Sequence, residues 1–432
     1  SGQGSQYVNM GRELATSLEA ARGVWDQAAD IALGEVPLHD VVFPPPAFTE
    51  SEQTTQASML TATQWAQPAI AAVQLSQLAV LRQLGIEPAM VGGHSFGEFT
   101  ALAAAGSMSS ADLLRVARRR GELMATATGM TGAMTAVLGA PDDLEQQAQA
   151  FGFGVVAANR NAPTQPVSPG QLAAIEQLEQ WLQARQIEFR RLPVSTAFHS
   201  ALVAPAVEPL KQFLADGEIH PAKVPVYANT TARPYPAEPH AVRAQLAEQL
   251  AAPVRFSEQI QNMYAAGVGV FLEVGPRAAL SSFVEQTLAG RPHLVVSLDR
   301  QGTDGVLAFC LALAKLAAAG VAMRPGELWR DDAPPADPRQ RKKAPLSVPI
   351  LGVNYGRPYP PPAGSVATPS PAVAGVPVAS TAASADAAAR GFLLRVQRDV
   401  ASGEQTADDR DERGGRLGQG AQEPVGVSRR HA

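Results

Sequence analysis

Apolar and polar positions alternate in a regular way over the first 325 residues, and this regularity is lost beyond them. Residues 64–84 carry apolar side chains at helical spacing, and the short apolar run at residues 90–92 predicts a strand. A turn at residues 93–97 follows, and a second helix is predicted from there to about residue 105. Strands that alternate with helices are typical of an α/β domain.

A third helix is predicted after Ser109, because Asp112 stands three residues later in a capping-box pattern. An arginine on an apolar helix face must find an anion or keep its charge in water at the rim. Arg120 is therefore a candidate for holding a substrate carboxylate through two parallel hydrogen bonds, and a structural ion pair is the alternative. The apolar stripe that includes it reads Leu113, Val116, Ala117, Arg120 and Met124.

The segment from residue 128 to residue 194 predicts a different order of elements: strand, helix, strand, helix, strand. Its strands are predicted at residues 134–138, 155–158 and 187–192, and strands at 224–227 and 268–274 then resume the first pattern. We therefore expect a small α+β subdomain inserted into a larger α/β body. The apolar face of its second helix consists of Leu172, Ile175, Leu178 and Leu182.

The expected body comprises residues 1–127 and 195–330, and the composition of the chain changes after it. Residues 331–390 are rich in alanine and proline and predict a linker, since such a composition buries too little apolar surface to fold alone. Residues 391–432 predict a short helix and a disordered tail.

Composition and charge narrow the possible functions. The 432-residue chain has a formal net charge of -5 and a pI of about 5.9, which argues against a nucleic-acid-binding protein. The single cysteine, Cys310, excludes an internal disulfide and fits a reducing cytoplasm, and we expect its thiol in the core. No signal peptide is recognisable, and the most apolar helix, residues 306–323, is interrupted by Lys315. We predict a soluble, cytoplasmic protein that binds no membrane.

The turn Gly93-His94-Ser95-Phe96-Gly97 matches the G-x-S-x-G pattern of a nucleophile elbow between a strand and a helix. Such a turn exposes the serine hydroxyl, and the helix N-terminus behind it stabilises negative charge. Ser95 is thus the candidate nucleophile. Of the seven histidines, His199 stands where the chain re-enters the body, and it is the candidate general base. The sequence has no H-E-x-x-H motif or cysteine pair, so we expect no metal site.

Together these motifs resemble the malonyl-CoA–acyl carrier protein transacylase family, which includes acyltransferase domains of type I polyketide and polyunsaturated fatty acid synthases. The resemblance extends from Ser1 to about Arg330, and it implies an α/β-hydrolase-like body with a parallel sheet and an inserted ferredoxin-like subdomain. At the elbow, the combination of Phe96 and Glu98 is most similar to the corresponding sequence in acyltransferases of polyunsaturated fatty acid synthases. The matching blocks, in the family's order, are Gly2–Gln6, Gln67–Ala69, Gly93–Gly97, Arg120–Gly121, Asn159–Pro163, Ala197–Ser200 and Glu273–Pro276.

The resemblance implies a reaction and the residues that perform it. Ser95 would be the nucleophile, His199 the base, and Arg120 the partner of the free malonyl carboxylate. Backbone N–H groups of Gln3 and Phe96 would form the oxyanion hole.

Four further positions have implied supporting roles. The backbone carbonyl of Gln249 would orient the histidine, while Gln67 and Asn161 would line the pocket. Phe198 would fill the space that an α-methyl group needs, which implies malonyl rather than methylmalonyl as the substrate.

The implied reaction moves malonyl from malonyl-CoA to the phosphopantetheine thiol of an acyl carrier protein, with no tightly bound cofactor. The ketosynthase and other domains of a megasynthase are implied as neighbours. A serine hydrolase or thioesterase is one alternative, and a non-catalytic megasynthase fragment is another.

Two departures from the family's pattern give expectations about structure. The chain begins inside the Gly-Gln-Gly motif, so the strand that precedes this motif in the family is expected to be missing. Pro166 and Pro169 are expected to interrupt the strand that follows Asn161.

Overall fold

The computed structural model describes residues 1–126, 132–139, 147, 159–192 and 197–330. The chain divides into two compact units, Ser1–Leu328 and Trp329–Ala432, and the first contains the described helices and strands up to η2, which crosses the boundary. The predicted strand at 155–158, the linker and the C-terminal helix lie outside the described residues.

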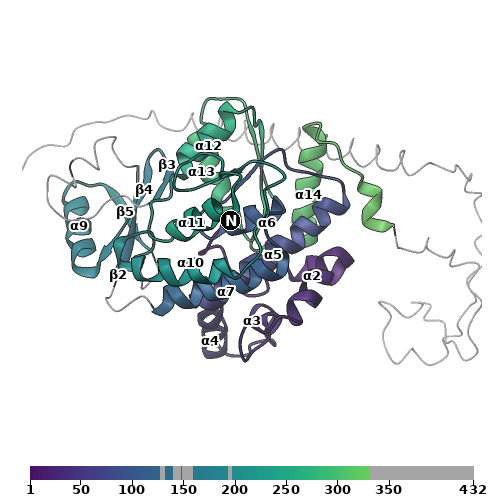
Figure 1. Ribbon diagram of the computed structural model, residues 1–432, viewed down its shortest axis with the longest axis horizontal. Coiled ribbons are helices and arrows are strands. Elements are labelled where there is room, and N and C mark those ends of the chain that lie inside the picture. The colour runs from purple at the N-terminus through teal and green to yellow at the C-terminus, as the bar shows by residue number, and fades with distance from the viewer. Residues whose placement is uncertain (127–131, 140–146, 148–158, 193–196, 331–432) are drawn as a thin grey trace, which may run out of the picture. The chain divides into compact units, whose positions relative to one another are not determined.

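A long central helix, α5 (Thr63–Gln83), organises the body (Figure 1). Most of its side chains are buried, and its closest helical neighbour is α7 (Ser110–Thr126). The two backbones approach so closely that a Cβ at Gly121 would lie 2.5 Å from the carbonyl oxygen of Thr63. The N-terminal helices around α5 are α1 (Arg12–Ser17), α2 (Glu19–Ala29), α3 (Leu38–Val42) and α4 (Glu50–Thr61).

Both helix predictions in this region are confirmed, including the start of α7. The backbone N–H of Asp112 donates to the Ser109 hydroxyl at 3.0 Å, as the capping pattern predicts. Pro68 lies inside α5 and has no N–H to offer the Gln64 carbonyl, which instead accepts from the Arg118 guanidinium at 3.4 Å.

Two short parallel strand pairs form the sheet part of the body. Strand β1 (Val91–Gly92) pairs with β6 (Val226–Tyr227), and β7 (Val270–Glu273) pairs with β8 (Leu294–Ser297). Three of these strands are predicted from the sequence, whereas β8 is not. Helix α6 (Gly97–Ala104) follows β1 directly, as expected. The remaining helices of the body are η1 (Ala201–Ala206), α10 (Val207–Ala215), α11 (Pro239–Glu248), α12 (Phe256–Ala265), α13 (Ala279–Thr287), α14 (Gly305–Ala318) and η2 (Pro325–Trp329).

A separate antiparallel sheet, seen at the left of Figure 1, has the strand order β3-β4-β2-β5. Helix α9 (Leu172–Ala184) packs on it through a buried face that includes the predicted Ile175, Leu178 and Leu182. The strands predicted at 134–138 and 187–192 are confirmed. The described strands of this sheet are β2 (Gly132–Leu138), β3 (Asn159–Ala162), β4 (Gln165–Gln171) and β5 (Glu188–Arg191).

The expectation that Pro166 and Pro169 interrupt the strand after Asn161 is wrong, because both lie within β4. Pro166 stands opposite Arg160, where the register with β3 shifts. Pro169 pairs with Met134 of β2, beyond the last residue of β4 that pairs with β3. A bulge and a position with one neighbouring strand both tolerate a missing N–H, which explains why the strand continues.

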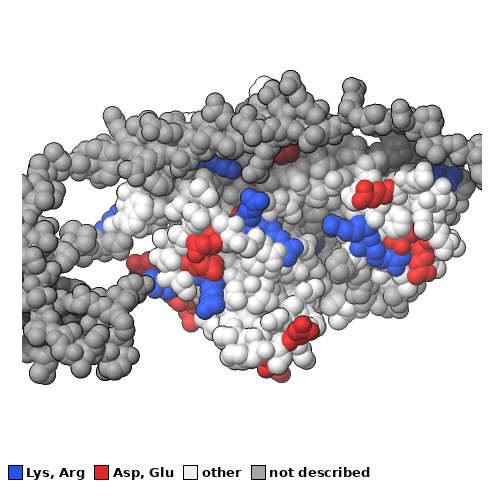
Figure 2. All heavy atoms as spheres, turned by 180° about the vertical axis from the view of Figure 1, so that it is seen from behind, with Lys and Arg blue, Asp and Glu red and all other residues white. Residues whose placement is uncertain are grey.

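The architecture confirms the expected class, an α/β body with parallel strands and a small α+β part. Within the described part of the chain no helix has both the length and the hydropathy that a membrane span requires. Cys310 is only partly buried, contrary to the expected core position, because it lies on α14 beside the exposed Leu311. Figure 2 shows acidic and basic side chains next to one another on the visible part of one face.

Candidate active site

Ser95 lies at a strained turn between β1 and α6, with a positive φ of 53°. This turn depends on glycine, because a Cβ at Gly93 would lie 2.0 Å from the carbonyl carbon of Gly97. The geometry is that of a nucleophile elbow: it lifts the serine side chain off the strand and sets it ahead of the helix N-terminus. Phe96 is the N-cap residue of α6, so its N–H lies at the positive end of that helix.

The imidazole of His199 contacts the hydroxyl of Ser95, with 2.7 Å between Nε2 and Oγ. Its other nitrogen, Nδ1, lies 3.1 Å from the carbonyl oxygen of Gln249 and 3.2 Å from that of Ala252. A carbonyl can only accept, so Nδ1 carries the proton and Nε2 is free to accept the serine proton. The described residues thus orient the histidine through main-chain carbonyls, and no carboxylate is needed for this.

The same surroundings keep His199 neutral. Burial lowers the pKa of its imidazole to about 3, and the positive charge of Arg120 adds to this effect. A neutral imidazole is the form that can remove a proton from the serine.

Arg120 is buried on α7, 1% exposed, together with the rest of the predicted apolar stripe. Its Nη1 donates to Gln67 Oε1 at 2.9 Å, and its Nη2 lies 3.4 Å from both Ser95 Oγ and Gln249 Oε1. Among the described residues nothing accepts from its buried Nε. Burial lowers the pKa of the guanidinium to about 9, and the charge of Glu98 opposes this shift. A buried cation with donor capacity to spare beside a nucleophile is suited to an anionic group of a substrate.

Gln67 and Gln3 connect the arginine to the opening motif of the chain. The amide of Gln67 accepts from Arg120 and donates to Gln3 Oε1 at 3.2 Å, while the Gln3 amide donates to Thr63 at 3.2 Å. Both predicted residues therefore lie in one hydrogen-bonded chain with the guanidinium.

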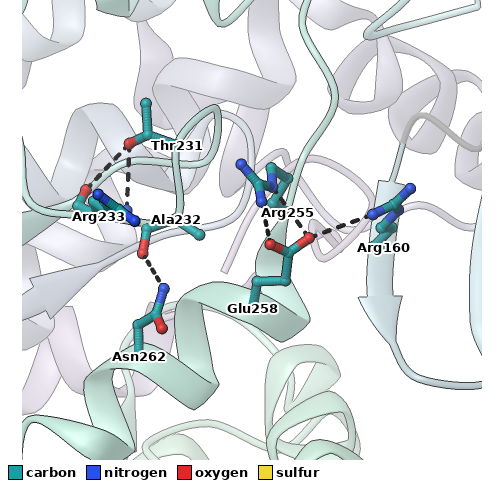
Figure 3. Close-up of polar contacts among 7 residues, drawn as sticks. All are labelled: Arg160, Thr231, Ala232, Arg233, Arg255, Glu258 and Asn262. Atoms are coloured by element: carbon teal, nitrogen blue, oxygen red, sulfur yellow. Dashed lines mark hydrogen bonds and ion pairs between the residues drawn. The ribbon is translucent and has the colours of Figure 1, made fainter.

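Asn161 is brought to the elbow from the small sheet. Its Oδ1 lies 2.6 Å from Nε2 of His94, and burial lowers the pKa of this histidine to about 4. The N–H of Arg160 donates to the carbonyl of Val254 at 2.8 Å, which joins β3 to the body. Figure 3 shows the second link, in which Glu258 of α12 pairs with both Arg160 and Arg255.

Phe198 is partly buried beside the histidine in sequence. It packs against the main core of the body and against a cluster of the small sheet that contains Met134, Ala136 and Val167. The ring thus lies where the two parts of the fold meet.

Sequence reasoning does not find the roles of two polar residues beneath the elbow, Glu98 and Asn229. Both are fully buried, and Asn229 accepts the N–H of Ser95 at 2.6 Å. A glutamate among the apolar residues of α6 is a readable signal, because an unpaired charge is rarely buried. Asn229 follows β6 and gives no comparable signal. Among the described residues no group of three or more potential ligands could hold a metal ion.

The comparisons with known proteins agree with this geometry. Residues 1–323 match the family described as "Acyl transferase domain". The chain is 37% identical to the malonyl CoA-acyl carrier protein transacylase of Bacillus subtilis over 66% of its own length and 88% of that protein. It is 32% identical to the phenolphthiocerol synthesis polyketide synthase Pks15/1 of Mycobacterium marinum, over 74% of this chain. It is 30% identical to one protein of the polyunsaturated fatty acid synthase of a Thraustochytrium species, over 78% of this chain. These matches span 15% and 12% of the two synthase proteins.

Two solved structures are similar to this chain in fold as well as in sequence. The acyltransferase domain from the second module of the salinomycin polyketide synthase superposes with a TM-score of 0.68 at 30% identity, over 76% of this chain and 75% of that one. A malonyl-transacylase in complex with a type II polyketide synthase acyl-carrier protein gives a TM-score of 0.63 at 28% identity, over 71% and 96%. The chain is therefore an acyltransferase and belongs to the acyl transferase domain family.

Proposed function

We propose that this acyltransferase moves a malonyl group from coenzyme A, through an ester on Ser95, to the phosphopantetheine thiol of an acyl carrier protein. The observation that carries the proposal is the buried guanidinium of Arg120, 3.4 Å from the hydroxyl of Ser95. A malonyl group on that hydroxyl ends in a free carboxylate two carbons beyond the ester. Such a carboxylate gives the guanidinium an anionic partner, which an acetyl group lacks.

The first half-reaction transfers malonyl to the enzyme. His199 Nε2 takes the proton of the Ser95 hydroxyl while Oγ bonds to the thioester carbonyl carbon. The tetrahedral intermediate collapses, the C–S bond breaks, and the imidazolium returns the proton to the coenzyme A sulfur. In the second half-reaction the carrier thiol gives its proton to His199 and attacks the ester. The C–O bond breaks, and the proton returns to Ser95.

The intermediate carries negative charge on the former carbonyl oxygen. We assign its stabilisation to the backbone N–H groups of Phe96 and Gln3. Phe96 begins α6, so the dipole of that helix adds to its hydrogen bond. Removal of one donor of this kind costs about 10²–10³ in rate in a well-studied enzyme.

Substrate selectivity is assigned to Phe198. Because the ring packs against both the body and the small sheet, it has little room to move aside for a methyl group. A single methyl group in a pocket discriminates by only about 1–3 kcal/mol, so methylmalonyl is expected to be a poor substrate rather than an excluded one.

The proposed carrier-protein partner and the proposed megasynthase context are supported by the similar proteins. One neighbouring structure is a malonyl-transacylase bound to an acyl-carrier protein, and two relatives are far longer synthases. We propose that the chain serves a megasynthase whose ketosynthase and other domains act on the malonylated carrier. We also propose that residues 128–194 form a small ferredoxin-like subdomain of this acyltransferase. A cytoplasmic location belongs to the same proposal.

Intact-protein mass spectrometry tests it directly. The protein is mixed briefly with equal amounts of malonyl-CoA, methylmalonyl-CoA and acetyl-CoA, with Ser95→Ala as the control. A malonyl adduct that is absent from the control supports the proposal. Free coenzyme A that accumulates without an adduct or a carrier acceptor identifies a hydrolase instead. No adduct and no turnover would identify a non-catalytic fragment.

A further inference from the structure

The backbone of the Ser95 turn is held by two buried amide side chains. Asn229 bridges both sides of it: Oδ1 accepts the N–H of Ser95 at 2.6 Å, and Nδ2 donates to the carbonyl of Gly93 at 2.6 Å. Gln249 holds the other polar group of the serine backbone, because its Nε2 donates to the Ser95 carbonyl at 2.7 Å. A residue with positive φ stays in that conformation only when its surroundings fix it.

Gln249 also links the other two groups of the site. Its backbone carbonyl accepts from Nδ1 of His199, and its Oε1 lies 3.4 Å from Nη2 of Arg120. One residue therefore contacts the nucleophile, the base and the guanidinium. Its orientation affects all three.

The carboxylate of Glu98 binds both of these residues, Asn229 through its backbone N–H and Gln249 through its side-chain amide. Oε2 accepts from the N–H of Asn229 at 3.0 Å and from Nε2 of Gln249 at 3.2 Å, while Oε1 accepts from the hydroxyl of Tyr235. Glu98 is fully buried on α6, three residues after the nucleophile. Hydrogen bonds to an ionised acceptor are about twice as strong as neutral ones, so a carboxylate suits a position that gathers three donors.

We propose that Glu98 is a positioning residue, whose carboxylate fixes the backbone of Asn229 and the side chain of Gln249, the two residues that hold the Ser95 turn. Its role concerns the geometry of the serine and not substrate contact. A buried carboxyl group is costly, and burial raises the pKa of Glu98 to about 7 despite its hydrogen bonds. The fold accepts this cost at a point where the group can order the nucleophile.

The inference rests on the proposed acyl transfer only for its substrate, so a substrate-independent probe is used first. A fluorophosphonate reacts with an activated serine: the Ser95 oxygen bonds to phosphorus, fluoride leaves, and His199 takes the serine proton. Its labelling rate reports the serine geometry whether or not malonyl is the natural group. The variants are Glu98→Gln, Asn229→Ala and their double variant.

Asn262→Ala is the matched control. The Nδ2 of Asn262 donates to the carbonyl of Ala232 at 2.8 Å (Figure 3). The substitution therefore removes one hydrogen bond between a side-chain amide and the backbone without touching the elbow.

Because small displacements of reacting groups cost about 10²-fold, we expect Asn229→Ala to slow labelling about 10²-fold. Glu98→Gln keeps the shape but loses the charge, and we expect labelling to slow about tenfold. The double variant should lose less than the product of the two factors, because one residue acts partly through the other. The control should keep the wild-type rate. Malonyl loading should show the same losses in maximal rate, with the half-saturating malonyl-CoA concentration nearly unchanged.

Glu98→Gln labelled at the wild-type rate would overturn the proposal, as would an equal loss in Asn262→Ala. A loss that appears only in the half-saturating concentration would also overturn it. Melting temperatures of all variants are measured alongside, and Asn229→Ala carries the geometric test if another variant unfolds. If every variant follows these expectations with the fluorophosphonate but none accepts malonyl, the positioning role stands and the proposed substrate is wrong.

Discussion

His199 contacts Ser95 through one ring nitrogen at 2.7 Å, while its other ring nitrogen faces two main-chain carbonyls. The pair is 104 residues apart in the chain, and the histidine itself has a positive φ of 59°. Two strained loops therefore meet at the reacting atoms. Because carbonyls fix the tautomer, the base is oriented by the backbone of the loop after α11 and not by an acidic side chain.

The first prediction concerns this base. His199→Ala removes the only group within hydrogen-bond reach of Ser95 Oγ that can accept its proton in the described site. General-base catalysis contributes about 10²–10⁴-fold, so malonyl loading of Ser95 should slow by that factor. Rapid-quench mass spectrometry of the acyl-enzyme measures it. A variant at His293, whose Nε2 lies 3.2 Å from Glu285 Oε2, is the control and should load normally. Equal loading by His199→Ala would remove the base from the mechanism.

The second prediction concerns pH. The pKa of His199 is lowered to about 3, so the neutral base persists as the pH falls from 8 to about 5. Glu98, with a pKa raised to about 7, also titrates in this range, so the wild-type protein should lose up to about tenfold in rate as this carboxylate is protonated. In Glu98→Gln the rate of loading at limiting malonyl-CoA should stay flat across the range, whereas an ordinary histidine would lose it with a midpoint near 6.5. Glu98→Gln separates the two, because an acid limb near 6.5 that remains in this variant belongs to the histidine and contradicts the prediction.

The third prediction concerns the carboxylate partner. Arg120→Ala should reduce loading from malonyl-CoA and shift the preference toward acetyl-CoA, because the bond to the free carboxylate is lost. Charge-assisted hydrogen bonds contribute about 1.5–3 kcal/mol each, which corresponds to a shift of roughly 10–100-fold in the competition. Arg120→Lys should recover little, since an ammonium cannot bind a carboxylate side-on.

A matched control lies one residue earlier on the same helix. Arg119 points to solvent and pairs with Glu122 at 3.6 Å, so Arg119→Ala should leave the malonyl preference unchanged. Melting curves of both variants show whether the loss of a buried side chain has unfolded the domain. Unchanged preference in a folded Arg120→Ala protein would contradict the role of the guanidinium.

Much of this site can be predicted from the sequence because its parts lie on local patterns. The elbow is one turn between a strand and a helix, and the apolar stripe of α7 places Arg120 inward by helical periodicity alone. The contacts of Gln67 and Gln249 are different. Only the resemblance to a family assigns them, since no local pattern says which amide lies near which donor.

The features that the sequence does not predict have physical causes. Strand β4 is not predicted because proline normally breaks a strand, yet each proline here stands where the ladder needs no N–H from it. Asn229 escapes notice because its function is set by contacts 134 and 136 residues away, with Ser95 and Gly93. A buried polar network is defined by tertiary packing, and hydrophobic periodicity carries no information about it.

The last prediction concerns extender selectivity. Phe198 is partly buried between the main core and the cluster around Met134, so Phe198→Ala opens a space beside His199 that a methyl group can enter. Since one pocket methyl is worth about 1–3 kcal/mol, competition between malonyl-CoA and methylmalonyl-CoA should shift toward methylmalonyl by roughly 10-fold or more. The ratio of the two adducts on Ser95 measures it. Phe213→Ala removes another partly buried ring of the body, on α10, and should cost stability without changing the ratio. A ratio that moves equally in both variants would mean that selectivity follows general loosening of the core, and Phe198 would then have no specific part in it.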